Sequence, residues 1–370
     1  MNNDTDLAFE EPENTPPPPP EDKPAHTGKP KQYVLEYDGK TGALFKLYLL
    51  DFFMRIITIG IYLFWGKTRL RKYILSHHAL GGDRFEYTGT GGELFKGFIK
   101  VLPILAILFI PLLFKEQYPI LMLIYLPLIY CYGIALYGAH RYRYSRTRWR
   151  GIRGYLDGST IGYANLAFGR LLLNIITLGF AVPSSDIAKH KYIMNNAYFG
   201  NIKAEFDGHS KVLFGAYIKS MLLVVFLTTL SSIGMFISIT AALTIGQVAA
   251  GGGMIISVLA FILIFPIARS IYAAALMREK MRGLKIGNLK FICTVNATDL
   301  IKLKLGNLLI LLLTFGIGYP FTAQRTIRFM ARHHIVMGNL DAFQAEQGKD
   351  QGLTSGEGLE AGFDIDVGFF

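Results

Sequence analysis

Long apolar runs alternate with short, strongly basic segments along this chain. Four runs approach the roughly 20 residues that a helix needs to cross a bilayer, and they cover residues 98–114, 118–139, 212–239 and 252–275. Only Lys115, Glu116 and Gln117 separate the first two runs, and an uncharged linker separates the last two. The pattern therefore predicts two transmembrane helical hairpins, at about 98–139 and 212–277.

The other ends of these hairpins carry the positive charge. Six arginines lie between Arg141 and Arg153, and the segment after Ala275 holds Arg278, Lys280, Arg282, Lys285 and Lys290. Because cytoplasmic ends of membrane helices are enriched in Lys and Arg, both hairpins are predicted to have their bases in the cytoplasm.

A threefold internal repeat surrounds the hairpins. Its anchor is Thr-x-Gly, at Thr58, Thr177 and Thr314, each after an apolar stretch. Fifteen residues after the threonine the chain has Tyr73, Tyr192 and Phe329. The copies are predicted to cover about 37–97, 156–216 and 295–345. Agreement at fixed offsets indicates a duplicated structural unit.

The repeats are poorer membrane spans than the hairpins, since each holds charged or amide side chains before its Thr-x-Gly. A charge at the centre of a lone helix costs roughly 2.5–3.5 kcal/mol. If the glycine makes a turn, each repeat enters the membrane and returns, and the chain crosses four times. If each repeat crosses once, there are seven crossings. Both alternatives predict an all-α polytopic integral membrane protein.

Composition supports a membrane protein. The 370 residues are 51% hydrophobic and only 18% charged, with a net charge of +11. The basic residues end apolar runs instead of forming a soluble basic patch, which argues against nucleic-acid binding. Residues 1–32 are acidic and proline-rich and are predicted to be a disordered tail, with a membrane domain at 33–345 and a flexible tail at 346–370.

The stretch "LLDFFMRIITIGIYLFWGKTRLRKYILSHHALGGDRFEYTGTGGELFKGF" resembles the YjgN family of bacterial inner-membrane proteins, also called DUF898. "TRWRGIRG", residues 147–154, is similar to the family's Arg-Gly-Ile-Arg element. The resemblance runs from about Tyr33 to Phe343. It implies a multi-pass protein of the bacterial inner membrane and implies no reaction.

Few motifs suggest chemistry. The pairs His77-His78 and His333-His334 share a repeat offset, but adjacent side chains do not form the i, i+4 pair of a zinc helix, so backbone-bonded or lipid-facing histidines are expected. Thr90 and Glu93 in "TGTGGE" are expected to form a capping box ahead of the first hairpin helix. We therefore expect no metal, no cofactor and no enzymatic activity.

Two groups of residues are candidate sites. The belt after the first hairpin mixes aromatic and basic residues, which suits lipid headgroups, although a role in topology alone or RNA binding would use the same residues. Its members are Arg141, Arg143, Arg146, Arg148, Trp149, Arg150 and Arg153. The second candidate is an intramembrane charge pair, Asp51 and Arg55, spaced i, i+4.

Two function classes remain open. Internal repeats, broken segments and charges in the membrane favour a transporter or channel for a small solute. The aromatic and basic belt favours a non-catalytic membrane-organising or anionic-lipid-binding protein. A lipid-acting enzyme is a third alternative. The expected partners are membrane lipids, with anionic lipids at the basic belt, and not nucleic acid.

Overall fold

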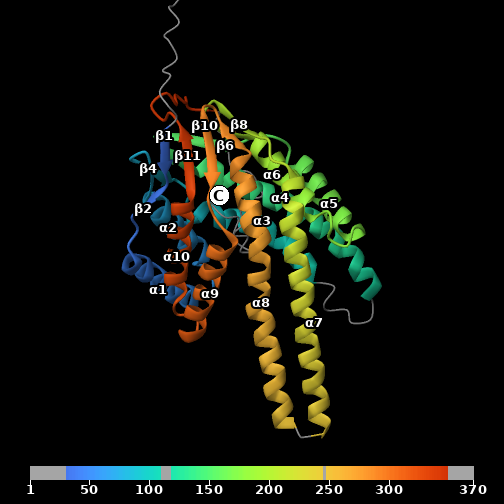
Figure 1. Ribbon diagram of the computed structural model, residues 1–370. Coiled ribbons are helices and arrows are strands. Elements are labelled where there is room, and N and C mark those ends of the chain that lie inside the picture. Colours follow the sequence, from blue (N-terminus) through green and yellow to red (C-terminus); the bar gives the residue numbers. More distant parts are fainter. Residues whose placement is uncertain (1–30, 110–117, 245–246, 349–370) are drawn as a thin grey trace, which may run out of the picture.

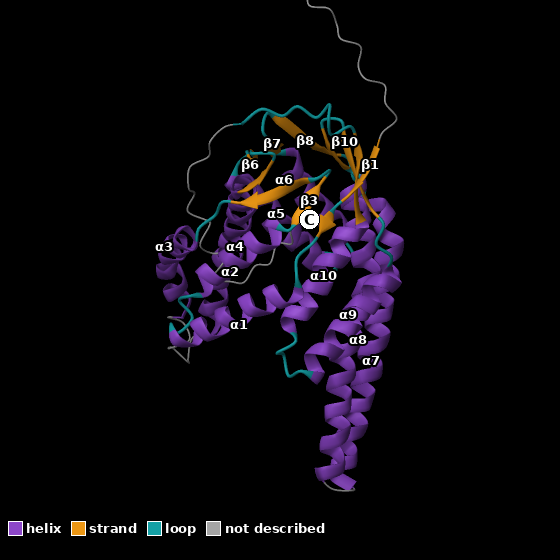
Figure 2. Ribbon diagram, turned by 90° about the vertical axis from the view of Figure 1, so that its left-hand side faces the viewer, coloured by secondary structure: helices purple, strands orange, loops and turns teal. Residues whose placement is uncertain are grey.

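The computed structural model, which describes residues 31–109, 118–244 and 247–348, contains one antiparallel sheet with helices on one side of it (Figures 1 and 2). Its eleven described strands are two to five residues long. They are β1 (Lys31–Val34), β2 (Glu36–Tyr37), β3 (His78–Leu80), β4 (Asp83–Tyr87), β5 (Thr147–Trp149), β6 (Ile152–Leu156), β7 (Ala197–Phe199), β8 (Ile202–Phe206), β9 (Leu284–Ile286), β10 (Leu289–Cys293) and β11 (His334–Gly338).

The sheet closes into a ring. Sequential strands pair from β2 through to β11, and β11 pairs with β1. Since only Leu35 separates β1 from β2, the first segment of the described chain joins the two ends of the sheet. Leu35 is buried, and its N–H donates to the carbonyl of His334.

The predicted all-α fold is wrong because of this ring. From β3 onward its strands lie within the predicted repeat copies and the basic segments that follow the two hairpins, where no strand was predicted. Tight turns join them: Gly81 and Gly82 both have positive φ, as do Arg150 and Gly151, which is the backbone of two-residue hairpins. In β4, β8 and β10 exposed residues, most of them polar, alternate with buried or half-buried ones, most of them apolar, because one face of these strands is exposed.

Three helical pairs leave the ring and return to it. Each first helix has 17 residues. The pairs are α1 (Thr41–Ile57) with α2 (Leu63–Ser76), α5 (Thr160–Ile176) with α6 (Val182–Asn195), and α9 (Ala297–Leu313) with α10 (Tyr319–His333). At 1.5 Å per residue, the far ends of all three first helices lie about 25 Å from their starts beside the ring.

Two further helical hairpins connect the pairs. The first is α3 (Gly91–Phe109) with α4 (Tyr118–Arg146), and the second is α7 (Phe214–Thr244) with α8 (Gln247–Arg282), preceded by the 3-10 turn η2 (Ser210–Leu213). Figure 1 shows α7 and α8 side by side, extending well beyond the other helices. The Ser220 hydroxyl on α7 donates to the carbonyl of Ala268 on α8, at 2.8 Å.

Among the described residues, one helical segment, Ser210–Thr240, is long and apolar enough to cross a membrane. Four spanning helices were predicted. Within the described chain, the single qualifying segment contradicts the polytopic fold that was expected. Residues 110–117 and 245–246, between the helices of each hairpin, lie outside the described residues, as do 1–30 and 349–370, which make up most of the two tails predicted at 1–32 and 346–370.

Aromatic and aliphatic side chains fill the ring. Trp149 lies within about 6 Å, ring to ring, of Phe85, Phe199 and Phe343. Phe343 belongs to the segment after β11, which continues across the ring and contributes buried Leu340. The inside of the ring is therefore a packed core.

Candidate functional site

The same tight turn joins the helices of each pair, at Thr-x-Gly. The middle residue is left-handed in every copy, with φ of 50° at Ile59, 50° at Leu178 and 48° at Phe315, and the following glycine has φ between 85° and 91°. A large apolar residue pays roughly 1–2 kcal/mol for this backbone. Strain retained at three equivalent positions indicates a functional constraint.

The threonine side chain supplies hydrogen bonds that the turn would otherwise lack. In the first copy the Thr58 hydroxyl donates to the carbonyl of Met54 at 2.7 Å and accepts the N–H of Tyr62 at 2.9 Å. Thr177 and Thr314 make the same two bonds at 2.6–3.1 Å. Where water is scarce, the backbone N–H and carbonyl groups of a turn need hydrogen-bond partners within the protein.

The middle residue of each turn is almost fully exposed. The exposed fractions are 93% for Ile59, 82% for Leu178 and 95% for Phe315. Neighbouring apolar side chains are exposed too, among them Phe52, Ile56, Ile57, Ile61, Ile175, Ile176, Phe180, Leu313, Ile317 and Phe321. We name these three ends the tips. Contiguous apolar exposure of this kind marks an interaction surface.

A polar side chain seven residues before each threonine ties the two helices of the pair together. Asp51 lies against α2, where Gly66 leaves room for its carboxylate. Arg170 donates to Ser184 at 3.2 Å, and Asn307 donates to Thr326 at 3.0 Å. Asp51 and Arg55 also form the i, i+4 ion pair proposed from the sequence. The equivalent roles of Arg170 and Asn307 were missed, although their shared offset could have revealed them.

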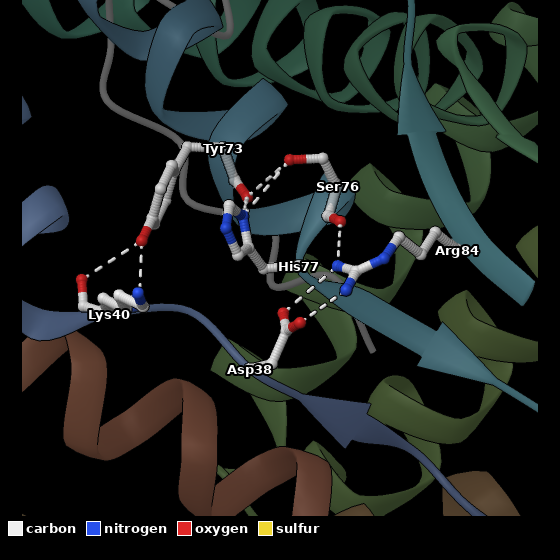
Figure 3. Close-up of polar contacts among 6 residues, drawn as sticks. All are labelled: Asp38, Lys40, Tyr73, Ser76, His77 and Arg84. Carbon is white, nitrogen blue, oxygen red and sulfur yellow. Dashed lines mark hydrogen bonds and ion pairs between the residues drawn. The ribbon is translucent and has the colours of Figure 1, made fainter. Parts of the chain in front are cut away.

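Polar contacts fix the base of the first helical pair beside the ring (Figure 3). Arg84 on β4 donates to both carboxylate oxygens of Asp38, at 2.5 and 3.2 Å, and to the carbonyl of Ser76 at 2.7 Å. The hydrogen bond from Arg84 holds the pKa of the Asp38 carboxyl below its ordinary value. The Tyr73 hydroxyl accepts from the N–H of Lys40 and donates to its carbonyl. Both ends of the pair are thereby held at the ring.

The histidine pairs contact the backbone at the ends of helices. Nδ1 of His77, His78 and His334 lies 2.6–2.8 Å from the carbonyl oxygen four residues earlier. His333 Nδ1 lies 2.9 Å from the hydroxyl of Thr294. The expected backbone contacts are confirmed, and they give these residues a structural role. No group of three metal-ligating side chains occurs among the residues that the structure describes.

The structure distributes the arginine belt over α4, β5 and β6. Arg141 donates to the carbonyls of Leu156 and Gly158, and Arg146 pairs with Glu93 at 3.0 Å. Arg150 pairs with Asp83 at 2.5 Å. Arg143 and Trp149 are buried. In the β5–β6 hairpin, Arg148 is directly opposite Arg153.

Several arginines of the belt therefore bind other groups of the protein itself. The belt does not form one continuous exposed row, because Trp149 fills the ring and several arginines hold the bases of the hairpins. The chemistry available to them is ion pairing and hydrogen bonding with nearby segments.

The capping box predicted at the start of α3 is confirmed. The Glu93 N–H donates to the Thr90 hydroxyl and the Thr90 N–H donates to the Glu93 carboxylate, both at 3.3 Å. The same carboxylate accepts from Tyr142 at 2.9 Å and Arg146 at 3.0 Å on α4. Glu93 thus joins the two helices of the first hairpin at their base.

Comparisons with known proteins cover most of the chain. The chain is 24% identical over 360 residues to the inner membrane protein YjgN of Salmonella typhimurium, an alignment covering 84% of this chain and 90% of that protein. This similarity supports the predicted inner-membrane location. No solved structure matches the chain.

The sequence model described as "Bacterial protein of unknown function (DUF898)" matches residues 32–361. The match begins at β1 and continues past the segment that fills the ring, so it contains all the helical pairs and both hairpins. The chain belongs to the DUF898 family.

Proposed function

We propose that this inner-membrane protein binds membrane lipid without catalysing a reaction, and that its three tips insert into the cytoplasmic leaflet. The observation that carries the proposal is the exposure of Ile59, Leu178 and Phe315 at three identical turns. Each apolar side chain of this size gains about 1.5–3 kcal/mol when it leaves water. Lipid would provide the apolar surroundings that the described chain does not provide for these three side chains.

The equal lengths of the first helices support insertion as a unit. With 17 residues in each of α1, α5 and α9, and with all three bases attached to one ring, the tips reach similar depths. Neighbouring basic residues, such as Lys46 and Lys302, have long side chains that can reach back to the headgroups.

The orientation follows from the ring. All described helices begin or end beside it, and the basic segments that were predicted to be cytoplasmic contain the ends of α4 and α8, the strands β5 and β9 and the starts of β6 and β10. We therefore place the ring and the hairpin bases in the cytoplasm. The α7–α8 hairpin, which with η2 contains the apolar segment Ser210–Thr240, would then anchor the protein in the membrane.

Depth measurements test the proposal. A variant with Cys131 and Cys293 changed to alanine would receive one nitroxide-labelled cysteine at 59, 178 or 315, with position 205 on the ring as the control. In vesicles, we expect high accessibility to oxygen and low accessibility to a nickel complex at all three tips, and the opposite at 205. Tips as accessible to nickel as position 205 would refute insertion.

A buried group of basic side chains favours a second candidate, transport of a small anion. His190 on α6 has its Nε2 enclosed and without a hydrogen-bond partner among the described residues. Burial, with Lys280 and His140 nearby, lowers the pKa of His190 to about 3. The nearby carboxylate of Asp186 accepts a hydrogen bond from the Tyr272 hydroxyl at 2.9 Å and pairs with Lys189 at 3.2 Å.

Flux measurements separate the two candidates. Proteoliposomes with and without the protein would be loaded with chloride, phosphate or small carboxylates. The lipid-binding proposal expects equal leakage from both. Protein-dependent flux that is lost in His190→Gln would favour transport. The packed interior of the ring, with Trp149 and Phe343 at its centre, argues against a passage there.

A further inference from the structure

An open groove lies between α2 and the start of α3, apart from the arginine belt. Its volume is about 310 Å³, at the lower end of the range for small-ligand sites. Four lining residues come from one face of α2 at helical spacing, and three come from the first turn of α3. The lining residues are Trp65, Thr68, Arg69, Lys72, Thr90, Gly91 and Gly92.

Two adjacent glycines shape the groove in different ways. A Cβ at Gly91 would lie 2.7 Å from the backbone of Trp65, so glycine there lets α3 begin directly against α2. A Cβ at Gly92 would have no heavy atom within 4 Å. Gly92 therefore borders open space, and a side chain added there would fill the groove without displacing a neighbour.

The groove is electrostatically suited to an anion. Arg69 and Lys72 are exposed on its α2 side. On its α3 side, the capping box uses the N–H groups of Thr90 and Glu93. Within the described chain the N–H groups of Gly91 and Gly92, in the first turn of α3, donate to no acceptor, and the first turn of a helix attracts negative charge. The Glu93 carboxylate is already bonded to Tyr142 and Arg146.

The face of α2 changes from apolar to cationic between the tip and the ring. Exposed Ile61 follows the turn, and Trp65, Arg69 and Lys72 succeed it toward the ring. Trp65 and Lys72 are about 10 Å apart along the helix axis. From the membrane interior outward, a phospholipid presents its acyl chains, the interfacial region and its headgroup in this same order. Tryptophan is enriched at the interface.

We propose that this groove binds the phosphate diester of an anionic phospholipid, with Arg69 and Lys72 on the phosphate and Trp65 beside the glycerol region. The site deepens the proposed function and rests on the tips being in the membrane. Exposed Ile99 and Leu102 on α3 continue the apolar surface along which acyl chains would lie.

The second repeat lacks most of the residues that line this groove and provides a matched control. When the two repeats are aligned on Thr58 and Thr177, the second repeat has Ser184 in place of Trp65 and Ala188 in place of Arg69. Its Lys191 corresponds to Lys72. Lys211 stands where the first repeat has Gly92, and the segment is the 3-10 turn η2 instead of the start of an α-helix. The second repeat therefore keeps one of the two cations and loses the open glycine, whereas the third repeat keeps both cations, as Arg325 and Arg328.

Native mass spectrometry of the full-length protein in detergent tests the site. Wild type would be titrated with phosphatidylglycerol and with phosphatidylcholine of the same acyl chains. We expect preferential binding of one phosphatidylglycerol. The variant Arg69→Gln/Lys72→Gln should bind it about ten- to thirtyfold more weakly, since each basic residue near an anionic headgroup contributes about 1 kcal/mol. Lys191→Gln/Lys211→Gln, with the same change in charge, should bind like wild type.

Gly92→Leu fills the groove without changing charge and should also weaken phosphatidylglycerol binding. It keeps the test valid if the double variant fails to fold, which circular dichroism would reveal. Wild-type affinity in folded Arg69→Gln/Lys72→Gln or in Gly92→Leu would overturn the site. Equal displacement of bound lipid by inorganic phosphate at the same concentration would overturn the lipid assignment.

The depth measurements distinguish this inference from the proposed function. Inserted tips with unchanged phosphatidylglycerol binding in the groove variants refute the groove alone. Tips found in water would refute the proposed function. If the groove variants then lost a phosphate-containing ligand selectively, the groove would be assigned to a soluble phosphate, and the lipid site would be overturned.

Discussion

The two ends of the helical pairs place similar apolar residues in opposite surroundings. At the ring, Trp149, Leu340 and Phe343 are buried and touch several neighbours. At the tips, Ile59 and Phe315 are more than nine-tenths exposed on a strained backbone. The ring end covers its apolar residues with protein, and the tip end leaves them uncovered, which is the difference that the proposed insertion would explain.

Trp149→Ala should give the largest effect, because it removes the aromatic side chain at the centre of the ring. We expect the free energy of unfolding to fall by about 3–5 kcal/mol. Urea unfolding in detergent, followed by circular dichroism, measures it. Trp65→Ala is the control, since Trp65 is 38% exposed. Equal losses in the two variants would remove the distinction between a packed ring and an exposed helix face.

Acidification should destabilise the ring end before the tips. Burial lowers the pKa of His190, which packs on Phe206 of β8, to about 3. Between this value and the ordinary 6.5 the unfolded chain binds the proton and the folded chain does not, so stability falls as pH falls. From pH 7.5 to pH 5 this residue should cost about 2 kcal/mol. His190→Gln should remove this contribution and leave that of His140, whose pKa burial also lowers to about 3, whereas exposed His209→Gln should leave both.

Gly60→Ala tests backbone strain at a tip. Gly60 has φ of +86° and no atom within 4 Å of an added Cβ, so the expected loss of about 1 kcal/mol comes from conformation alone. Gly42→Ala is the matched control, since Gly42 also has open space but lies in α1. There alanine should stabilise by up to about 1 kcal/mol. The same sign in both variants, by thermal unfolding, would contradict the left-handed turn.

Phe315→Ala should have the smallest effect on stability, less than about 0.5 kcal/mol in detergent, because the side chain touches little of the protein. Its effect should appear in vesicles, as a shallower position of a label at 317. A large stability loss in detergent would mean that the tip packs against protein.

The sequence supported local features better than the sheet. The capping box of Thr90 and Glu93 follows from residue type and spacing, and so does the contact of Asp51 with Arg55. Both depend on residues within one helical turn, where the chemistry of a few side chains decides the outcome.

The ring could not be derived in the same way. Its strands have at most five residues, too few for a clear alternating pattern. The Gly81-Gly82 and Arg150-Gly151 pairs do signal hairpin turns, and giving them more weight would have predicted some strands. Pairing of β1 with β11 depends on segments at opposite ends of the described chain, which no local pattern encodes.

Closure of the ring by β1 also sets an order of assembly. Lys31 pairs with Gly338, so during synthesis the first strand must wait until nearly the whole domain has left the ribosome. Every helical hairpin is made in that interval, and closure can only follow. Until then the edges of β1 and β10 have no β11 to cover them, and open edges invite pairing between chains. A chain ending before residue 334 would keep both edges permanently, so closure of the ring requires synthesis through β11.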